Sequence, residues 1–143
     1  MSYKFLNAFL IVCIALTLQF LVGEASGMWL SLTLAALVAS AFFLDFLELI
    51  TLALFSVLIL NWQPAFSFEM LLLMVLPLVT FFFHKLIPFA PIVGNAILFA
   101  ISIIIFYVSI GGGFIMHSPS VFFLDVLASL LLGTVACASM QSA

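Results

Sequence analysis

Apolar residues follow one another almost without a break from Trp29 to Leu60, and the only charged residues among these 32 are Asp45 and Glu48. A single helix of this length would rise roughly 48 Å, whereas the hydrocarbon core of a bilayer is roughly 30 Å thick. It would also bury two carboxylates, which is costly in hydrocarbon. The pattern therefore predicts a hairpin of two shorter helices, with Asp45 and Glu48 in a turn at a membrane surface.

The remaining charged residues divide the chain into similar lengths. Most successive charged positions are separated by about the 17 to 25 residues that one bilayer crossing requires, and they are Lys4, Glu24, Asp45 with Glu48, Glu69, Lys85 and Asp125. We expect most of these charges to mark helix ends. The six predicted helices cover residues 4–22, 28–44, 48–61, 68–86, 91–110 and 119–139. Residues 1–143 are thus predicted to form a single transmembrane domain.

The turn at Asp45 and Glu48 contains neither Gly nor Pro, so one long helix over residues 28–61, giving five helices in all, is an alternative. Under that alternative the two acids lie within the membrane and suit a proton or ion pathway. Six helices place Lys4 and Lys85 on one membrane face, as expected if positive residues stay inside the cell. The predicted fold class is therefore an all-α, polytopic transmembrane bundle with both chain ends on the inner side.

Composition supports a membrane location, because 69% of the residues are hydrophobic, 5% are charged and the mean hydropathy is +1.57. Such a chain has too few polar side chains to cover a soluble globule. The apolar runs are longer than the roughly 10-residue alternating strands of transmembrane barrels, so the spans are predicted to be helices in a lipid bilayer. With a net charge of −3 and no arginine, the chain lacks a basic patch, which excludes nucleic acid as a partner.

Small residues recur on one face of several predicted helices. Helices in lipid approach closely where side chains are small, so these faces are expected to pack inward while most Phe and Leu side chains face lipid. They comprise Ala35 with Ala39, Ala36 with Ser40, the series Asp125, Ser129, Gly133 and Cys137, and Asn95, Ser102 and Ser109 at seven-residue intervals. Such faces are also candidates for contacts with other membrane proteins.

Asp125 is the acid that the spacing leaves unexplained, because it follows Pro119 by six residues and so lies about 9 Å into the last helix. A carboxylate within a membrane is a candidate functional group by default. One hypothesis is an outward-facing polar pocket made of Asp125 together with His117, Asn95 and Ser109. The alternative is an interfacial carboxylate, stabilised by the dipole at the start of its own helix.

Asp45, Glu48 and Lys85 form a second group, interpreted as a solvated cytoplasmic turn that could contact a partner. The sequence contains no Ser-His-Asp, His-Glu-x-x-His or paired intramembrane aspartate arrangement, so we do not expect an enzyme. Cys13 and Cys137 are too few and too far apart in sequence for a zinc site and are interpreted as small apolar fillers. No metal or other cofactor is expected.

Six short helices, an inner N-terminus, minimal loops and a second helix ending in Phe42-Phe43-Leu44-Asp45 before a tight turn resemble one known group. The chain is similar in these features to the MreD family of bacterial rod-shape-determining membrane proteins, and more distantly to the substrate-binding S components of energy-coupling-factor transporters. The resemblance to MreD implies a non-catalytic subunit of the bacterial inner membrane that helps to hold a peptidoglycan-synthesis assembly together, without a cofactor.

Two functions from different classes follow as expectations. The first is a scaffold or accessory subunit of a bacterial membrane assembly, related to cell shape or the cell wall. The second is a transport component that binds a small solute in the pocket near Asp125. A transport component should have a water-accessible polar cavity between helices, whereas a scaffold should be solidly packed and should expose a small-residue seam to its partner.

Overall fold

The computed structural model describes residues 2–26, 31–61 and 67–142, and the regular structure in these ranges is entirely helical. Six helices have ten or more residues: α1 (Tyr3–Ser26), α2 (Ser31–Ser40), α3 (Phe46–Leu60), α4 (Phe68–Phe83), α5 (Pro91–Gly111) and α7 (Pro119–Ser142). Two short helices, η1 (His84–Leu86) and α6 (Gly113–His117), adjoin α4 and α7. The predicted all-α bundle of six helices is confirmed.

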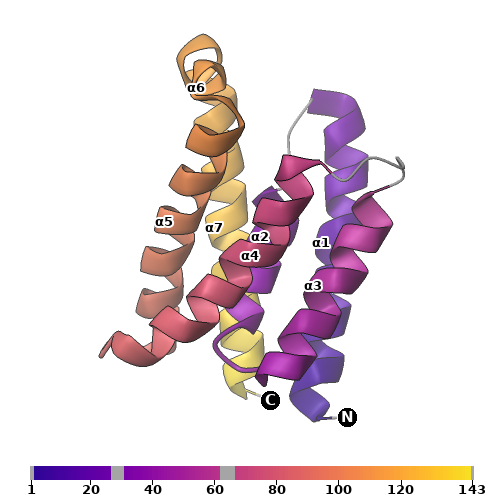
Figure 1. Cartoon of the computed structure of the whole chain (residues 1–143), viewed down its shortest axis with the longest axis vertical. Coiled ribbons are helices and arrows are strands. Elements are labelled where there is room, and N and C mark those ends of the chain that lie inside the picture. Colours follow the sequence, from indigo (N-terminus) through magenta and orange to yellow (C-terminus); the bar gives the residue numbers. More distant parts are fainter. Residues whose placement is uncertain (1, 27–30, 62–66, 143) are drawn as a thin grey trace.

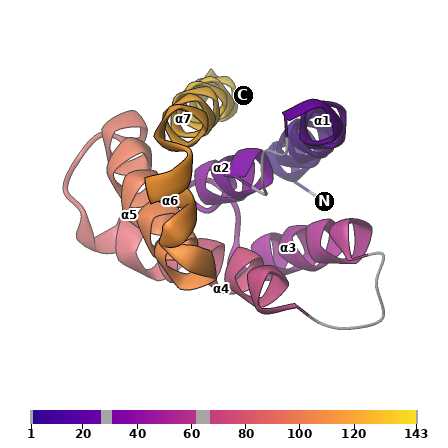
Figure 2. The same ribbon diagram turned by 90° about the horizontal axis from the view of Figure 1, so that it is seen from above.

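The helix α2 lies at the centre of the bundle, and the other five long helices surround it (Figure 2). It contacts α1, α3, α4, α5 and α7. Those five helices also contact one another in the order α7, α1, α3, α4, α5 and back to α7. They therefore form a closed ring, which separates the central helix from its surroundings and brings α1 and α7 side by side.

The composition of α2 explains its central position. Every residue from 33 to 41 is buried, and five of these nine are Ala or Ser. A helix that is apolar on all sides is typical of a fully buried site, and small side chains allow several neighbours to approach. Ten residues rise only about 15 Å, half of a bilayer core, so α2 depends on the ring for shelter.

The chain leaves α2 through a tight turn and reverses into α3, so residues 28–61 are not one helix and the five-helix alternative is wrong. The backbone N–H groups of Phe43 and Leu44 donate to the carbonyl of Ser40 at 3.1 and 3.0 Å. Asp45 is then the N-cap of α3. The helix predicted over residues 28–44 is also corrected at its end, since α2 ends at Ser40 and residues 41–43 form the turn. Residues 28–30 of that prediction lie outside the described residues.

Four segments are long and apolar enough to cross a membrane: Tyr3–Leu21, Phe68–Leu86, Pro91–Gly111 and Pro119–Ser142. The helix α3 is apolar but has only 15 residues, about 22 Å of rise, in agreement with the short third helix predicted from the sequence. The bundle thus combines four long spans with two shorter helices, α2 and α3, which follow each other in the chain.

Both chain termini lie at one end of the bundle, the N/C end, together with the turn between α2 and α3 (Figure 1). The connection between α4 and α5, which carries Lys85, is on the same side, and α6 lies at the opposite end (Figure 1). This alternation is the one that six successive helices predict. It places Lys4 and Lys85 at the same end, as the distribution of positive charge suggested.

Candidate functional site

Asp125 lies inside the bundle. Its side chain is 2% exposed, and Tyr107 of α5 donates its hydroxyl to Asp125 Oδ2 across the contact between α5 and α7. Pro119 begins α7, and six further residues carry Asp125 beyond the first turn, so the carboxylate meets a neighbouring helix. The ring of Tyr107 also packs edge-on against Phe122, with 4.9 Å between centroids. Asp125 is therefore an interior residue that joins two helices.

The other three predicted pocket residues do not gather around Asp125. His117 is exposed, and its Nδ1 lies 2.7 Å from the carbonyl oxygen of Gly113 in the same short helix. Ser109 is exposed as well. Asn95 is buried, at 1% exposure, but it lies twelve residues before Tyr107 on α5, which corresponds to about 18 Å of helix rise. The predicted grouping of all four in one pocket is therefore not seen.

The small-residue series of α7 is buried as predicted. Asp125, Ser129, Gly133 and Cys137 face inward, while Phe123, Leu124, Leu127, Leu131 and Val135 are exposed. We call the buried series, with the residues of α2 and α5 that it contacts, the interior seam. Ser102 of α5 is buried as well, whereas Ser109, seven residues later, is exposed.

Gly133 is the point where three helices of the interior seam meet. A Cβ atom at this position would lie 3.3 Å from Asn95 Nδ2 of α5 and 3.8 Å from both the Cβ and the carbonyl oxygen of Ala35 of α2. The absence of a side chain thus lets the Asn95 amide approach the backbone of α7. Asn95 Oδ1 is buried there and accepts no hydrogen bond from the residues that the structure describes.

The predicted turn residues Asp45 and Glu48 define the start of α3. The backbone of Asp45 is extended (φ −72°, ψ 159°), and its N–H donates to Glu48 Oε2 at 3.4 Å, one half of a capping box. Ser2 donates its hydroxyl to Glu48 Oε1 at 2.9 Å and accepts the N–H of Phe5 at 3.1 Å. Glu48 therefore joins the start of α1 to the start of α3 at the N/C end.

Lys85, the third residue of that predicted group, has a different contact. Its Nζ lies 4.8 Å from the centroid of the Phe81 ring, a cation–π arrangement within one helical turn. The neighbouring His84 ring packs against Phe42 and Phe81, with centroids 5.2 and 5.5 Å apart. Lys85 shares the N/C end with Asp45 and Glu48 but forms no ion pair with either acid.

Sequence reasoning missed the polar contact between α1 and α2. Gln19 Oε1 accepts the backbone N–H of Thr33 at 3.2 Å and the Thr33 hydroxyl at 2.5 Å, with both residues buried. The first N–H groups of a helix have no partner within it, so Gln19 caps α2 from a neighbouring helix. The signal was a lone amide in the middle of an apolar run. Tyr107, the partner of Asp125, was missed as well.

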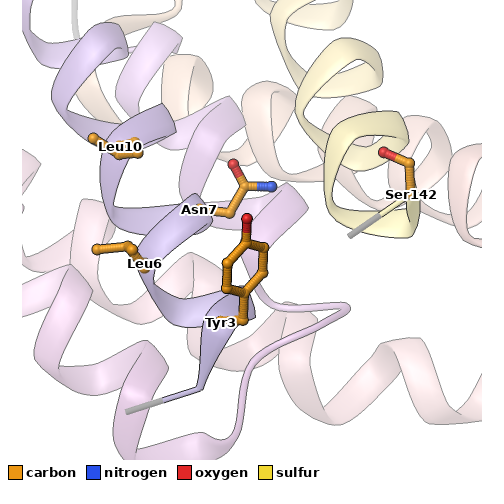
Figure 3. Close-up of a pocket in the computed structure, with 5 residues that line it drawn as sticks. All are labelled: Tyr3, Leu6, Asn7, Leu10 and Ser142. Atoms are coloured by element: carbon orange, nitrogen blue, oxygen red, sulfur yellow. The ribbon is translucent and has the colours of Figure 1, made fainter.

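Hollows lined by described residues lie on both sides of α1. One of about 400 Å³ opens between α1 and α7 at the N/C end and is lined by Tyr3, Leu6, Asn7, Leu10 and Ser142 (Figure 3). Asn7 points toward α7 there and donates to the carbonyl of Ser139 at 3.4 Å. Two further hollows, of about 180 and 420 Å³, lie between α1 and α3.

Comparison with family models, curated proteins and solved structures gives no match to this chain. The geometry of the bundle and its surface is thus the basis for a functional proposal.

Proposed function

We propose that this chain is a non-catalytic subunit of a membrane protein assembly, which it joins through contacts between helices in the bilayer. The proposal rests on the positions of two features, the buried polar groups and the surface hollows. Buried polar side chains hold the chain's own helices together, and the hollows described above open on the outer surface beside α1.

The interior supports the proposal because its polar groups are largely used in packing. Asp125 joins α7 to α5, and Gln19 joins α1 to α2. The hydroxyls of Ser40, Ser56 and Thr80 donate to carbonyls of their own helices. The small-residue faces of α2 and α7 are occupied by contacts within the chain, so they are not the exposed seam expected of a scaffold. A partner would instead meet the outer faces of the ring.

We further propose that the assembly lies in the inner membrane of a bacterium and serves cell shape or cell-wall synthesis. This finer statement rests on the resemblance to MreD at Phe42-Phe43-Leu44-Asp45, a segment that lies in the turn between α2 and α3 and ends at the N-cap of α3. The cytoplasmic contact predicted for Asp45, Glu48 and Lys85 would then be made from the N/C end.

A crosslinking scan tests the proposed function in the membranes of the native host. A photoreactive amino acid is placed at Leu10 of α1, Leu54 of α3, Ile104 of α5 and Leu131 of α7, all of which are exposed. A subunit should give protein adducts of defined mass from one or two faces, and the chain extracted without detergent should migrate as a complex of matching mass. Adducts with lipid alone from all four faces, together with migration as a single chain, would overturn the proposal.

A second candidate function is transport of a small polar solute along the interior seam. It is favoured by a buried carboxylate, Asp125, on the same face of α7 as Gly133. The position of Gly133 adjoins Nδ2 of the Asn95 amide, and Oδ1 of that amide accepts no hydrogen bond from the described residues. Asp125→Asn should then abolish solute uptake in cells while the assembly keeps its mass. Tyr107→Phe is the matched control for loss of the contact between α5 and α7. Unchanged uptake in Asp125→Asn cells removes this candidate.

A further inference from the structure

The groove between α1 and α3 has an apolar floor with few free polar groups. It is lined by Phe5, Leu6 and Phe9 of α1 and by Thr51, Leu52 and Phe55 of α3, and its volume is about 180 Å³. The rings of Phe9 and Phe55 pack across it with centroids 5.0 Å apart. The Thr51 hydroxyl donates to the carbonyl of Leu47 at 2.8 Å, so it is satisfied by its own helix.

The groove continues toward the N/C end into a wider, acidic hollow. This second hollow, about 420 Å³, shares Phe5 and Thr51 with the groove and is also lined by Leu47 and Glu48. Glu48 is half-buried and Asp45, three residues earlier, is exposed. Within the described part of the chain neither acid forms an ion pair, although Glu48 accepts hydrogen bonds from Ser2 and Asp45. Among the described residues, therefore, no ion pair neutralises the negative charge at this end. The groove and the acidic hollow together are called the trough.

We infer that this trough binds a transmembrane helix of a partner protein that carries Lys or Arg at its cytoplasmic end. The inference rests on the proposed function and names the chemistry of the partner. Apolar side chains of the partner helix would fill the groove, and its terminal cation would lie against Glu48 and Asp45. Membrane helices commonly carry basic residues at their cytoplasmic ends, and the N/C end holds both lysines of this chain.

Charge distinguishes such a helix from an anionic lipid. An anionic phospholipid that laid an acyl chain in the groove would bring a net negative headgroup to the depth of Glu48 and Asp45, where two carboxylates repel it. A basic helix end is attracted at the same place. A zwitterionic headgroup carries its own ammonium, and competition by phosphatidylethanolamine distinguishes that lipid from a helix. A contact between partly exposed charges raises binding affinity only modestly, by about fivefold. Packing of the partner helix in the groove therefore supplies the remaining affinity.

Binding to reconstituted protein tests the inference with two matched peptide pools. The chain is placed in phosphatidylcholine nanodiscs and offered transmembrane peptides of about 20 residues with randomised Leu, Ile, Val, Phe and Ala cores. One pool ends in Lys-Lys and the other in Gln-Gln. We expect about fivefold greater recovery of the Lys-ended pool. The double variant Asp45→Asn with Glu48→Gln should lower that ratio to one.

Two further variants separate the contribution of the groove to peptide binding from the contribution of the acidic residues. Thr51→Trp fills the groove at an exposed position and should reduce recovery of both pools. Glu69→Gln removes an acid from the first turn of α4, away from the trough, and should leave the ratio at its wild-type value. Circular dichroism of each variant verifies that the helices remain folded.

Equal recovery of the two pools by the wild-type chain, or undiminished recovery by Thr51→Trp, would overturn the inference. Loss of binding on addition of phosphatidylethanolamine would assign the trough to lipid and would also overturn it. A different result would be that the peptides show no binding to the trough while the crosslinking scan still gives protein adducts from other faces. That result contradicts the docking site and leaves the proposed function supported. If the scan also gives no protein adducts from any of the four faces, both the docking site and the proposed function are overturned.

Discussion

Asp125 and Glu48 are both carboxylates in the first two turns of a helix, yet they hold different parts of the molecule together. Asp125 is buried and accepts a hydrogen bond from Tyr107 on another helix. Glu48 is half-buried, accepts the N–H of its own N-cap and receives the hydroxyl of Ser2. In the interior a carboxylate needs a partner from a neighbouring helix because water is absent. At the N/C end it fixes a local turn.

The stability of the bundle should therefore depend on the interior seam far more than on the N/C end. The seam contains the contacts of the central helix with α5 and α7, whose close approach depends on small residues. The N/C end contains a cap that water can partly replace. Substitutions in the two regions therefore give graded tests.

The largest effect is expected for Gly133→Leu. Even a Cβ atom would lie 3.3 Å from Asn95 Nδ2, so a leucine forces α7 away from α2 and α5. We expect the free energy of unfolding to fall by about 3 kcal/mol, measured by denaturant titration in mild detergent. The matched control is Gly111→Leu, because a Cβ there meets no atom within 4 Å. Similar losses in both variants would contradict the special role of the seam.

A smaller effect is expected when the pair of Asp125 and Tyr107 is broken. Asp125→Ala and Tyr107→Phe should each lower the free energy of unfolding by about 1 to 2 kcal/mol, because hydrogen bonds between membrane helices contribute modestly. The double variant should lose less than the sum of the two, since both substitutions remove one interaction. Strict additivity would show that the contact between α5 and α7 does not depend on this hydrogen bond.

Much of the fold could be predicted from the sequence because hydrophobic length and charge spacing constrain membrane helices strongly. The hairpin at Asp45 was predictable from the desolvation of two acids, and the burial of Ser129, Gly133 and Cys137 from their spacing. The central position of α2 was not predictable, because apolar composition alone does not distinguish a helix facing lipid from one surrounded by helices.

The candidate site was less predictable for a related reason. Asp125 was recognised by its depth, but its partner Tyr107 comes from another helix, and the spacing along the chain does not link the two residues. His117 and Ser109 were grouped with Asp125 by position along the membrane normal, and they lie on the exposed surface. Depth can be read from the sequence, whereas the direction in which a side chain leaves its helix depends on packing between helices.

At the N/C end, Glu48→Ala should have a limited effect. It removes the acceptor for the Asp45 N–H and for the Ser2 hydroxyl, and loss of such a cap lowers the free energy of unfolding by about 0.5 to 1 kcal/mol. Hydrogen exchange should accelerate in the first turns of α1 and α3 and remain unchanged in α7. Faster exchange throughout α7 would contradict this expectation, because it would show that the N/C end and the interior seam are coupled.

The smallest effect, and one of opposite sign, is expected for Asn95→Leu. Asn95 Oδ1 is buried without a hydrogen bond from the described residues, so an apolar side chain of similar shape relieves the cost of its desolvation. The free energy of unfolding should stay unchanged or rise by up to about 1 kcal/mol, whereas Asn95→Ala should lower it by opening a cavity. A clear loss of stability in Asn95→Leu would mean that this oxygen has a partner in the membrane. A buried water or solute at Gly133 would then be the natural candidate, and transport along the seam would gain support over a purely structural interior.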